Sequence, residues 1–220
     1  MTRKLTRLQT LLTGGAFALA GIGGGTAAAF GADQPTTPDT AAVAQAEALT
    51  NPVAAPAAPS QAELHPMGIT AAQKTFTPSA EQLDNAKAIV DTAKEMGLPP
   101  RAWTIAVATS LQETNLKNIG HLGAKNDHDS QGLFQQRPST GWGTAEQITD
   151  PAYATKAFLE GTDSNRGLTD IDGWENMPLT TAAQKVQVSA YPEHYAKHEQ
   201  QAGDIINAIH GTGPYANLAS

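Results

Sequence analysis

The chain has 220 residues and contains no cysteine. This absence excludes a disulfide framework, a thiol nucleophile and a cysteine-ligated zinc site. It leaves the compartment open, because an exported protein does not require disulfides. Aromatic residues make up 5% of the chain, so alanine supplies much of its 40% hydrophobic content. The length suits one domain with extensions.

Acidic residues are absent from the N-terminal stretch, where the first is Asp33. Three of the 14 lysines and arginines lie before it, so residues 31–220 carry a net charge of −10 against −7 for the whole chain. Binding to nucleic acid or to an anionic membrane surface requires clustered Lys and Arg. We therefore expect no nucleic acid partner, and the acidity is better explained by solubility.

Long apolar runs are missing too, and the nearest approach to one lies in residues 1–29. Basic residues come first, an apolar centre follows over residues 11–22, and small residues lead to Ala29. This order is typical of a signal peptide cleaved near Ala29. The alternative is an uncleaved anchor, but the centre is shorter than the roughly 20 apolar residues of a spanning helix. We expect a secreted, extracellular protein without a stable membrane span in its mature form.

Residues 30–77 are rich in Ala, Pro, Thr and Gln and poor in large apolar side chains. Such a segment buries too little surface to offset the entropy lost on ordering. We expect a disordered linker, with a short helix over residues 40–49.

Residues 78–220 have the helical periodicity of a folded, mostly α domain. Ser79 and Gln82 form a capping-box pattern before a helix that Gly97 ends. The next helix, from residue 100 to Glu113, has almost no polar face and is predicted to be central. Further helices are expected over residues 151–160, 180–190 and 193–209.

Residues 118–149 lack strong periodicity and contain five glycines. Irregular loops of this length inside a domain are usually functional. Glu113 stands where the apolar helix gives way to this loop. A glutamate at that point is, taken alone, more typical of a surface or capping residue.

Three motifs occur in order along the domain: Glu113 followed by a small hydroxyl residue, "GLFQ" about 20 residues later, and "AY" near the last helices. Together they resemble the lytic transglycosylase family of the lysozyme-like superfamily, over roughly residues 80–210. The run "GLFQQRPSTGWGTAEQITDPAYATKAFL" is similar to secreted or tail-associated lysozyme-like proteins of high-G+C Gram-positive bacteria. The resemblance implies a lysozyme-like helical domain with an irregular Gly-rich cleft loop.

The resemblance also implies roles for individual residues. Glu113 would be the catalytic acid and base, and Tyr191 would hydrogen-bond to it. The substrate-binding residues would be Gln135, Ser130, Gly132, Phe134 and Trp142. Each also has an ordinary interpretation: a core tyrosine, a glutamine bonded to loop backbone, a turn glycine, a loop hydroxyl or a packed ring.

The sequence departs from the family pattern at three positions. The usual Ser after the glutamate is Thr114, and the usual Met of "GLMQ" is Phe134. Pro192 stands where an Asn normally follows "AY". Because that Asn often contacts substrate, its loss leaves the sugar contacts and the activity itself open.

Other groups of residues give weaker indications of a functional site. Asp127 or Asp129 could be the second carboxylate of a hydrolase. His194 and His198 would share a helix face at i, i+4, but the glutamate of a zinc-binding HExxH motif is missing. Neither a phosphate-binding glycine loop nor "GxSxG" occurs. We expect no metal and no cofactor.

The sequence thus predicts a peptidoglycan-cleaving lytic transglycosylase that acts on the MurNAc–GlcNAc bond of glycan strands and is a monomer. The alternatives are a muramidase-type hydrolase and a catalytically inactive glycan-binding or envelope scaffold domain.

Overall fold

A computed structural model describes residues 57–126 and 128–219. The predicted signal peptide, most of the predicted linker and its helix over residues 40–49 lie outside these residues. The described helices are α2 (Gln61–Leu64), α3 (Ala80–Glu95), α4 (Pro100–Thr114), α5 (Ala145–Ile148), α6 (Pro151–Glu160), α7 (Leu179–Gln187) and α8 (Glu199–Ile209). The described residues contain no strand, only two isolated bridges, one of which joins Gln131 to Gln136 and closes the "GLFQQ" turn. The prediction of a mostly α fold is confirmed.

Local signals set the ends of several helices. The Ser79 hydroxyl accepts from the Gln82 backbone N–H, and the Gln82 side chain accepts from the Ser79 N–H at 2.8 Å. Asp150 caps α6 by accepting from the Tyr153 N–H at 2.7 Å, with Pro151 as the first helical residue. These contacts satisfy N–H groups that the first helical turn leaves unpaired.

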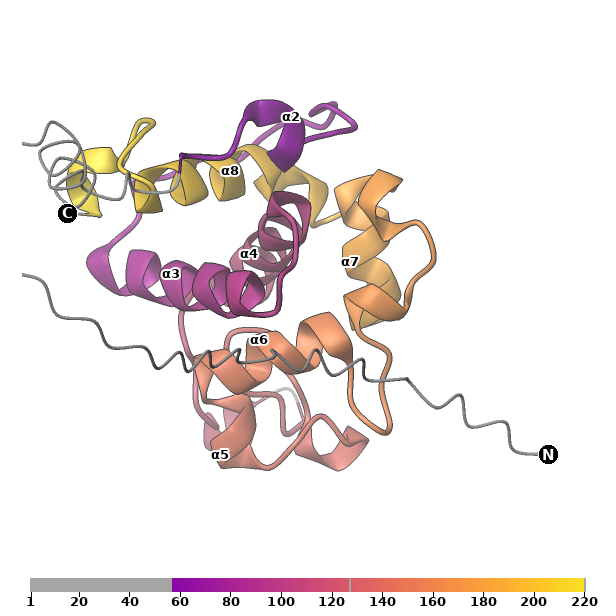
Figure 1. Cartoon of the computed structure of the whole chain (residues 1–220). Helices are drawn as coiled ribbons and strands as arrows, with labels where there is room; N and C mark the ends of the chain where they lie inside the picture. Colours follow the sequence, from indigo (N-terminus) through magenta and orange to yellow (C-terminus); the bar gives the residue numbers. More distant parts are fainter. Residues whose placement is uncertain (1–56, 127, 220) are drawn as a thin grey trace, which may run out of the picture. The chain divides into compact units, whose positions relative to one another are not determined.

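Helix α4 is the central helix of the domain. Every residue from Arg101 to Leu111 is buried. The helix contacts α2, α3, α6, α7 and α8, and Figure 1 shows it between α3 and α8. Its apolar surface on all sides is therefore covered by neighbouring helices, and its C-terminal end carries Glu113.

The last two predicted helices differ from their expected bounds. Helix α7 ends at Gln187 because Val188 adopts a left-handed conformation with φ of 49°. Helix α8 begins at Glu199, after a short 3₁₀ turn over Ala196–His198. Pro192 lacks an N–H and disfavours helical geometry in the residue before it, which accounts for the loop at residues 188–195. His194 and His198 therefore do not share a helix face, and that prediction was wrong.

The end of the predicted linker, residues 57–77, instead packs on the helical domain. Helix α2 has a Ser60–Glu63 capping box, and Leu64 is fully buried. The Gln73 side chain donates to the Ala196 carbonyl at 2.9 Å and accepts from the Gln200 N–H at 2.8 Å. The expectation of a disordered linker is therefore wrong from residue 57 on.

A buried ion pair fastens this segment to α4 and α8. Arg101 Nη1 lies 2.6 Å from Glu199 Oε1 and also donates to the Leu64 carbonyl at 3.2 Å. His65 Nδ1 lies 3.6 Å from the same Glu199 oxygen. A Cβ at Gly203 of α8 would come within 2.4 Å of His65 Nε2, so only glycine allows this approach.

We expect Leu64→Ala to destabilise the domain by roughly 2–3 kcal/mol, the lower part of the range for Leu→Ala at buried sites. The measurement is urea unfolding of the full chain. Met67→Ala is the control, because Met67 follows Leu64 closely but is half exposed. Equal, small effects of both changes would show that residues 57–77 do not contribute to the core.

None of the described helices is a candidate membrane span, since none combines sufficient length with an apolar composition.

Candidate active site

A cavity of about 670 Å³ lies at the C-terminal end of α4. The α4 end, the loop at residues 130–142 and the α7 end with its following loop form its walls. Six of the seven predicted site residues line it: Glu113, Ser130, Phe134, Gln135, Trp142 and Tyr191. Segments distant in the sequence thus meet around one cavity.

Glu113 is half-buried in this cavity, in the last turn of α4. The helix ends one residue later, at Thr114, because Asn115 and Leu116 both have positive φ. Burial raises the pKa of the Glu113 carboxyl, while hydrogen bonds from Tyr195 and Gln187 partly oppose the shift. A carboxyl with a raised pKa can keep its proton nearer neutral pH, as a general acid must.

The tyrosine that bonds Glu113 is Tyr195, not Tyr191. Tyr195 Oη donates to Glu113 Oε1 at 2.9 Å, and the Tyr195 residue is fully buried. Tyr191 is 63% exposed on the cavity rim and stacks on His194 with ring centroids 4.8 Å apart. The predicted Tyr191–Glu113 hydrogen bond was wrong.

The segment "AYPEHY", residues 190–195, explains why Tyr195 rather than Tyr191 bonds Glu113. Pro192 keeps the segment in a loop, so Tyr191 stays outside and the chain returns to the core four residues later at Tyr195. Burial and the adjacent Glu113 carboxyl both raise the Tyr195 pKa, so its hydroxyl stays protonated and can donate. The second tyrosine and the proline were both visible in the sequence, but the packing that selects Tyr195 was not.

Backbone contacts hold the "GLFQ" turn against Glu113. Thr114, the replacement for the usual Ser, donates to the Leu133 carbonyl at 3.2 Å. Gln187 donates to the Phe134 carbonyl at 2.9 Å while it also bonds Glu113. The Phe134 ring itself is buried and stacks on Phe158, with centroids 4.8 Å apart. Gln187 was not predicted as a site residue, although it connects the acid to the turn.

Gln135, Ser130 and Gly132 have distinct environments. Gln135 adopts φ of 50°, and its side chain donates to the Gly132 carbonyl at 3.2 Å. Ser130 is buried, and its carbonyl accepts from Asn126 at 2.9 Å. Gly132 does not line the cavity. A Cβ there would lie 1.9 Å from the Ile148 carbonyl oxygen, so the glycine permits close packing of the turn.

Trp142 lines the cavity although it is only 9% exposed. Its carbonyl accepts from the Tyr153 hydroxyl at 3.2 Å. The cavity also contains polar residues that were not predicted, among them Arg137, Thr140 and Asn165. Their donors and acceptors suit a ligand rich in hydroxyl and amide groups.

Asp129 lies outside the cavity lining and has a structural role. It accepts from the Ser139 N–H at 2.7 Å and from the Ser139 hydroxyl at 2.8 Å, and lies 3.2 Å from Arg137 Nε. These contacts, with the Ser139 N–H foremost, lower the Asp129 pKa to about 2. Asp129 is thus a fixed anion that holds the loop. Asp127 lies outside the described residues.

Within residues 57–126 and 128–219, no three His, Cys, Asp or Glu side chains come together as a metal site. A scan against protein-family models finds no match, and a search of curated proteins finds no matching sequence.

We expect Glu113→Gln to make the protein more stable at neutral pH. Because the folded-state pKa of Glu113 is raised, ionising it costs stability as pH rises through that pKa. Gln carries no charge and can still accept from Tyr195. The melting temperature of the variant should exceed that of the wild type at pH 7 to 8, and the difference should vanish below about pH 4. A variant less stable at pH 7 would contradict the raised pKa.

Proposed function

We propose that the protein is an exported lysozyme-like glycosidase that cleaves the MurNAc–GlcNAc bond of peptidoglycan by the lytic transglycosylase route. One observation carries the proposal: Glu113 is the only carboxylate among the described residues lining the cavity, and burial raises its pKa. The motif resemblance supports the same reaction. We also propose secretion to the cell wall on the basis of residues 1–29.

A single carboxyl can complete this reaction. Protonated Glu113 gives its proton to the glycosidic oxygen as the bond from that oxygen to C1 of MurNAc breaks. The carbonyl oxygen of the substrate's own N-acetyl group then bonds C1 and balances the developing positive charge. The Glu113 carboxylate next takes the proton of the 6-hydroxyl of the same sugar, whose oxygen attacks C1 and displaces the acetamido oxygen. The product is a 1,6-anhydro sugar, and Glu113 regains its proton without consuming water.

Tyr195 and Gln187 would position the acid in this scheme. Tyr195 bonds one carboxyl oxygen, and Gln187 connects the carboxyl to the Phe134 carbonyl. Both contacts fix the direction of the proton that Glu113 delivers. Because they also favour the ionised form, they keep the pKa from rising as far as burial alone would raise it.

The function is tested by the release of soluble fragments from purified peptidoglycan by the full chain. We expect wild-type protein to release fragments and Glu113→Gln protein to bind the insoluble material without releasing any. Binding by both proteins without release would favour a glycan-binding domain, and a failure of both to bind would favour a scaffold role.

Tyr195→Phe tests the assignment of the positioning tyrosine. Loss of the hydroxyl removes a contact that lowers the Glu113 pKa, so that pKa should rise further. Cleavage requires protonated Glu113, and the rate falls as pH rises through its pKa. The alkaline limb of the rate profile should therefore move to higher pH. The rate at the optimum should fall by about tenfold, less than the 10²- to 10⁴-fold typical of a group that itself transfers the proton.

Tyr191→Phe is the matched control, because Tyr191 lies on the same cavity but does not contact Glu113. Its alkaline limb should coincide with that of the wild type. A shift in Tyr191→Phe and none in Tyr195→Phe would restore the assignment made from sequence.

A further inference from the structure

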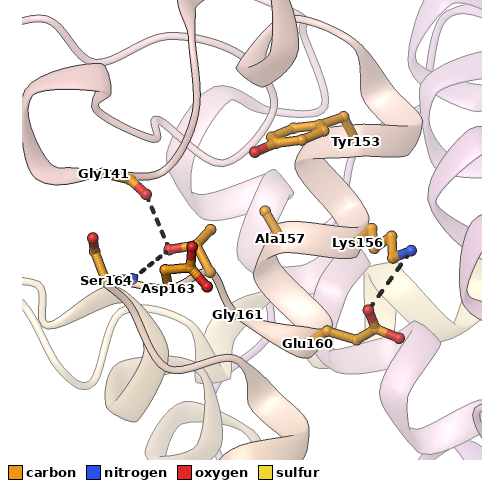
Figure 2. A pocket seen from close by; sticks show the side chains of 9 residues that line it. Gly141, Tyr153, Lys156, Ala157, Glu160, Gly161, Asp163 and Ser164 are labelled. Atoms are coloured by element: carbon orange, nitrogen blue, oxygen red, sulfur yellow. Dashed lines mark hydrogen bonds and ion pairs between the residues drawn. The ribbon is translucent and has the colours of Figure 1, made fainter.

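A second hollow of about 510 Å³ lies beside the cavity that holds Glu113. Its lining comes from α6 and from the loops at residues 141 and 161–164. Figure 2 shows Tyr153 and Ala157 on α6 opposite the loop that carries Asp163 and Ser164. The hollow contains no predicted site residue, and the single-carboxylate mechanism does not use it.

One wall separates the two hollows. Thr140 and Trp142 line the Glu113 cavity, and Gly141 between them lines the second hollow. The opposing loop repeats this arrangement, because Thr162 and Ser164 line the second hollow and Asn165 lines the cavity.

Hydrogen bonds and close packing hold this wall together. Asn165 donates to the Thr140 carbonyl at 3.0 Å, and Thr162 donates to the Gly141 carbonyl at 3.0 Å. A Cβ at Gly141 would approach Ser164 Oγ to 2.6 Å. A side branch of a chain lying in the cavity therefore has only this wall to cross before it reaches the second hollow.

The second hollow has the chemistry of a site for a charged amino acid. The half-buried Tyr153 ring and Ala157 supply an apolar surface. Glu160 and Lys156 lie 3.8 Å apart on its edge. Asp163 is exposed and has no hydrogen bond or ion pair with any described residue. Lys156 balances the charge of Glu160, so Asp163 leaves the hollow with a net negative charge. This charge favours a ligand group with positive charge.

We propose that this second hollow binds the ammonium-bearing side chain of the peptide branches that peptidoglycan strands carry. This inference rests on the proposed function, since it takes the ligand to be a branch of the strand in the Glu113 cavity. Asp163 receives the ammonium group, Glu160 on the opposite side of the hollow adds negative charge, and the Tyr153 ring covers the aliphatic stem. The enzyme then favours strands whose peptides are intact and whose amines are free.

The test compares a Glu160→Gln/Asp163→Asn double variant with the wild type on two substrates. One is purified peptidoglycan, and the other is the same material stripped of peptides by an amidase. We expect the double variant to lose about three- to tenfold in kcat/KM on the peptide-bearing substrate, as for one or two exposed ion pairs. On stripped glycan it should match the wild type.

The matched control is Asp172→Asn/Glu175→Gln, which removes two exposed acids that line neither hollow. It should behave as the wild type on both substrates. An equal loss of kcat/KM in both double variants would show that the loss comes from the change in net charge and not from the second hollow, which would overturn the proposal. Unchanged rates in the Glu160→Gln/Asp163→Asn variant would overturn the proposal while leaving the glycosidase intact.

If the wild type cleaves neither substrate, the proposed function is refuted. A binding measurement still tests the proposal for the second hollow in that case. The probe is the peptide fraction released by the amidase, titrated calorimetrically before and after acetylation of its amines. Wild type and control should bind the free-amine peptide, and acetylation or the Glu160→Gln/Asp163→Asn change should weaken binding. Binding equal in all cases, or absent from the wild type at millimolar peptide, would overturn the proposal.

Discussion

Glu113→Gln is expected to lower the rate of peptidoglycan cleavage by about 10²- to 10⁴-fold, the contribution typical of a positioned general acid and base. The amide keeps the shape of the side chain and can still accept from Tyr195, so the cavity should remain intact. It cannot give a proton to the glycosidic oxygen or take one from the 6-hydroxyl. Both steps of the proposed reaction are therefore lost together, whereas glycan binding is retained.

The matched control for this change is Glu175→Gln, because Glu175 is exposed and lines neither hollow. Its rate should equal that of the wild type. The readout is the initial rate of fragment release from purified peptidoglycan, with binding measured by cosedimentation. A Glu113→Gln protein that retains more than about a tenth of the wild-type rate would remove Glu113 from the catalytic role.

Arg101→Ala is expected to cost about 3–5 kcal/mol of unfolding free energy, the range for breaking a buried ion pair by removing one partner. Arg101 and Glu199 have side chains only 4% and 8% exposed. The change leaves the Glu199 carboxylate buried without its main partner and frees the Leu64 and Met177 carbonyls that Arg101 also bonds.

The pH dependence of this loss follows from Glu199. Burial alone would raise the pKa of that carboxyl, but His65 and Arg101 outweigh burial and hold it below its usual value. A depressed folded-state pKa contributes stability above the unfolded pKa, and this stability is lost as pH falls through the folded pKa. The cost of Arg101→Ala should therefore be largest at neutral pH and shrink in acid.

The control is the double variant Arg101→Met/Glu199→Leu, which replaces both charges by apolar groups. Such replacements are often neutral or stabilising. Urea unfolding at pH 7 should show that the double variant recovers most of the stability lost in Arg101→Ala. A loss below about 1 kcal/mol in Arg101→Ala, typical of a surface pair, would mean that the pair is not buried in solution.

The helices with strong local signals were predictable from the sequence. The Ser79–Gln82 capping box and the Asp150–Pro151 start both specify helix ends through contacts within four residues. The apolar run of α4 likewise predicted a central helix. These features depend on neighbouring residues, which the sequence displays directly.

Features that depend on tertiary packing were not predictable. Residues 57–77 look disordered because few of them are apolar, yet Leu64 reaches the core and Arg101 bonds its carbonyl. The same applies to the site. The order of the motifs predicted that Glu113, Gln135 and Trp142 would act together, and all three line one cavity. Whether Tyr195 or Tyr191 bonds Glu113 depends on where the loop after α7 rejoins the core.

Mass spectrometry of the fragments released from purified peptidoglycan by the full chain tests the central claim most directly. With Glu113 as the only acid and base, the fragments should end in 1,6-anhydro-MurNAc, lighter by one water than hydrolytic products. Fragments with a reducing-end MurNAc would instead require a water nucleophile and a muramidase mechanism. That result would contradict the transglycosylase route and direct attention to Asp127.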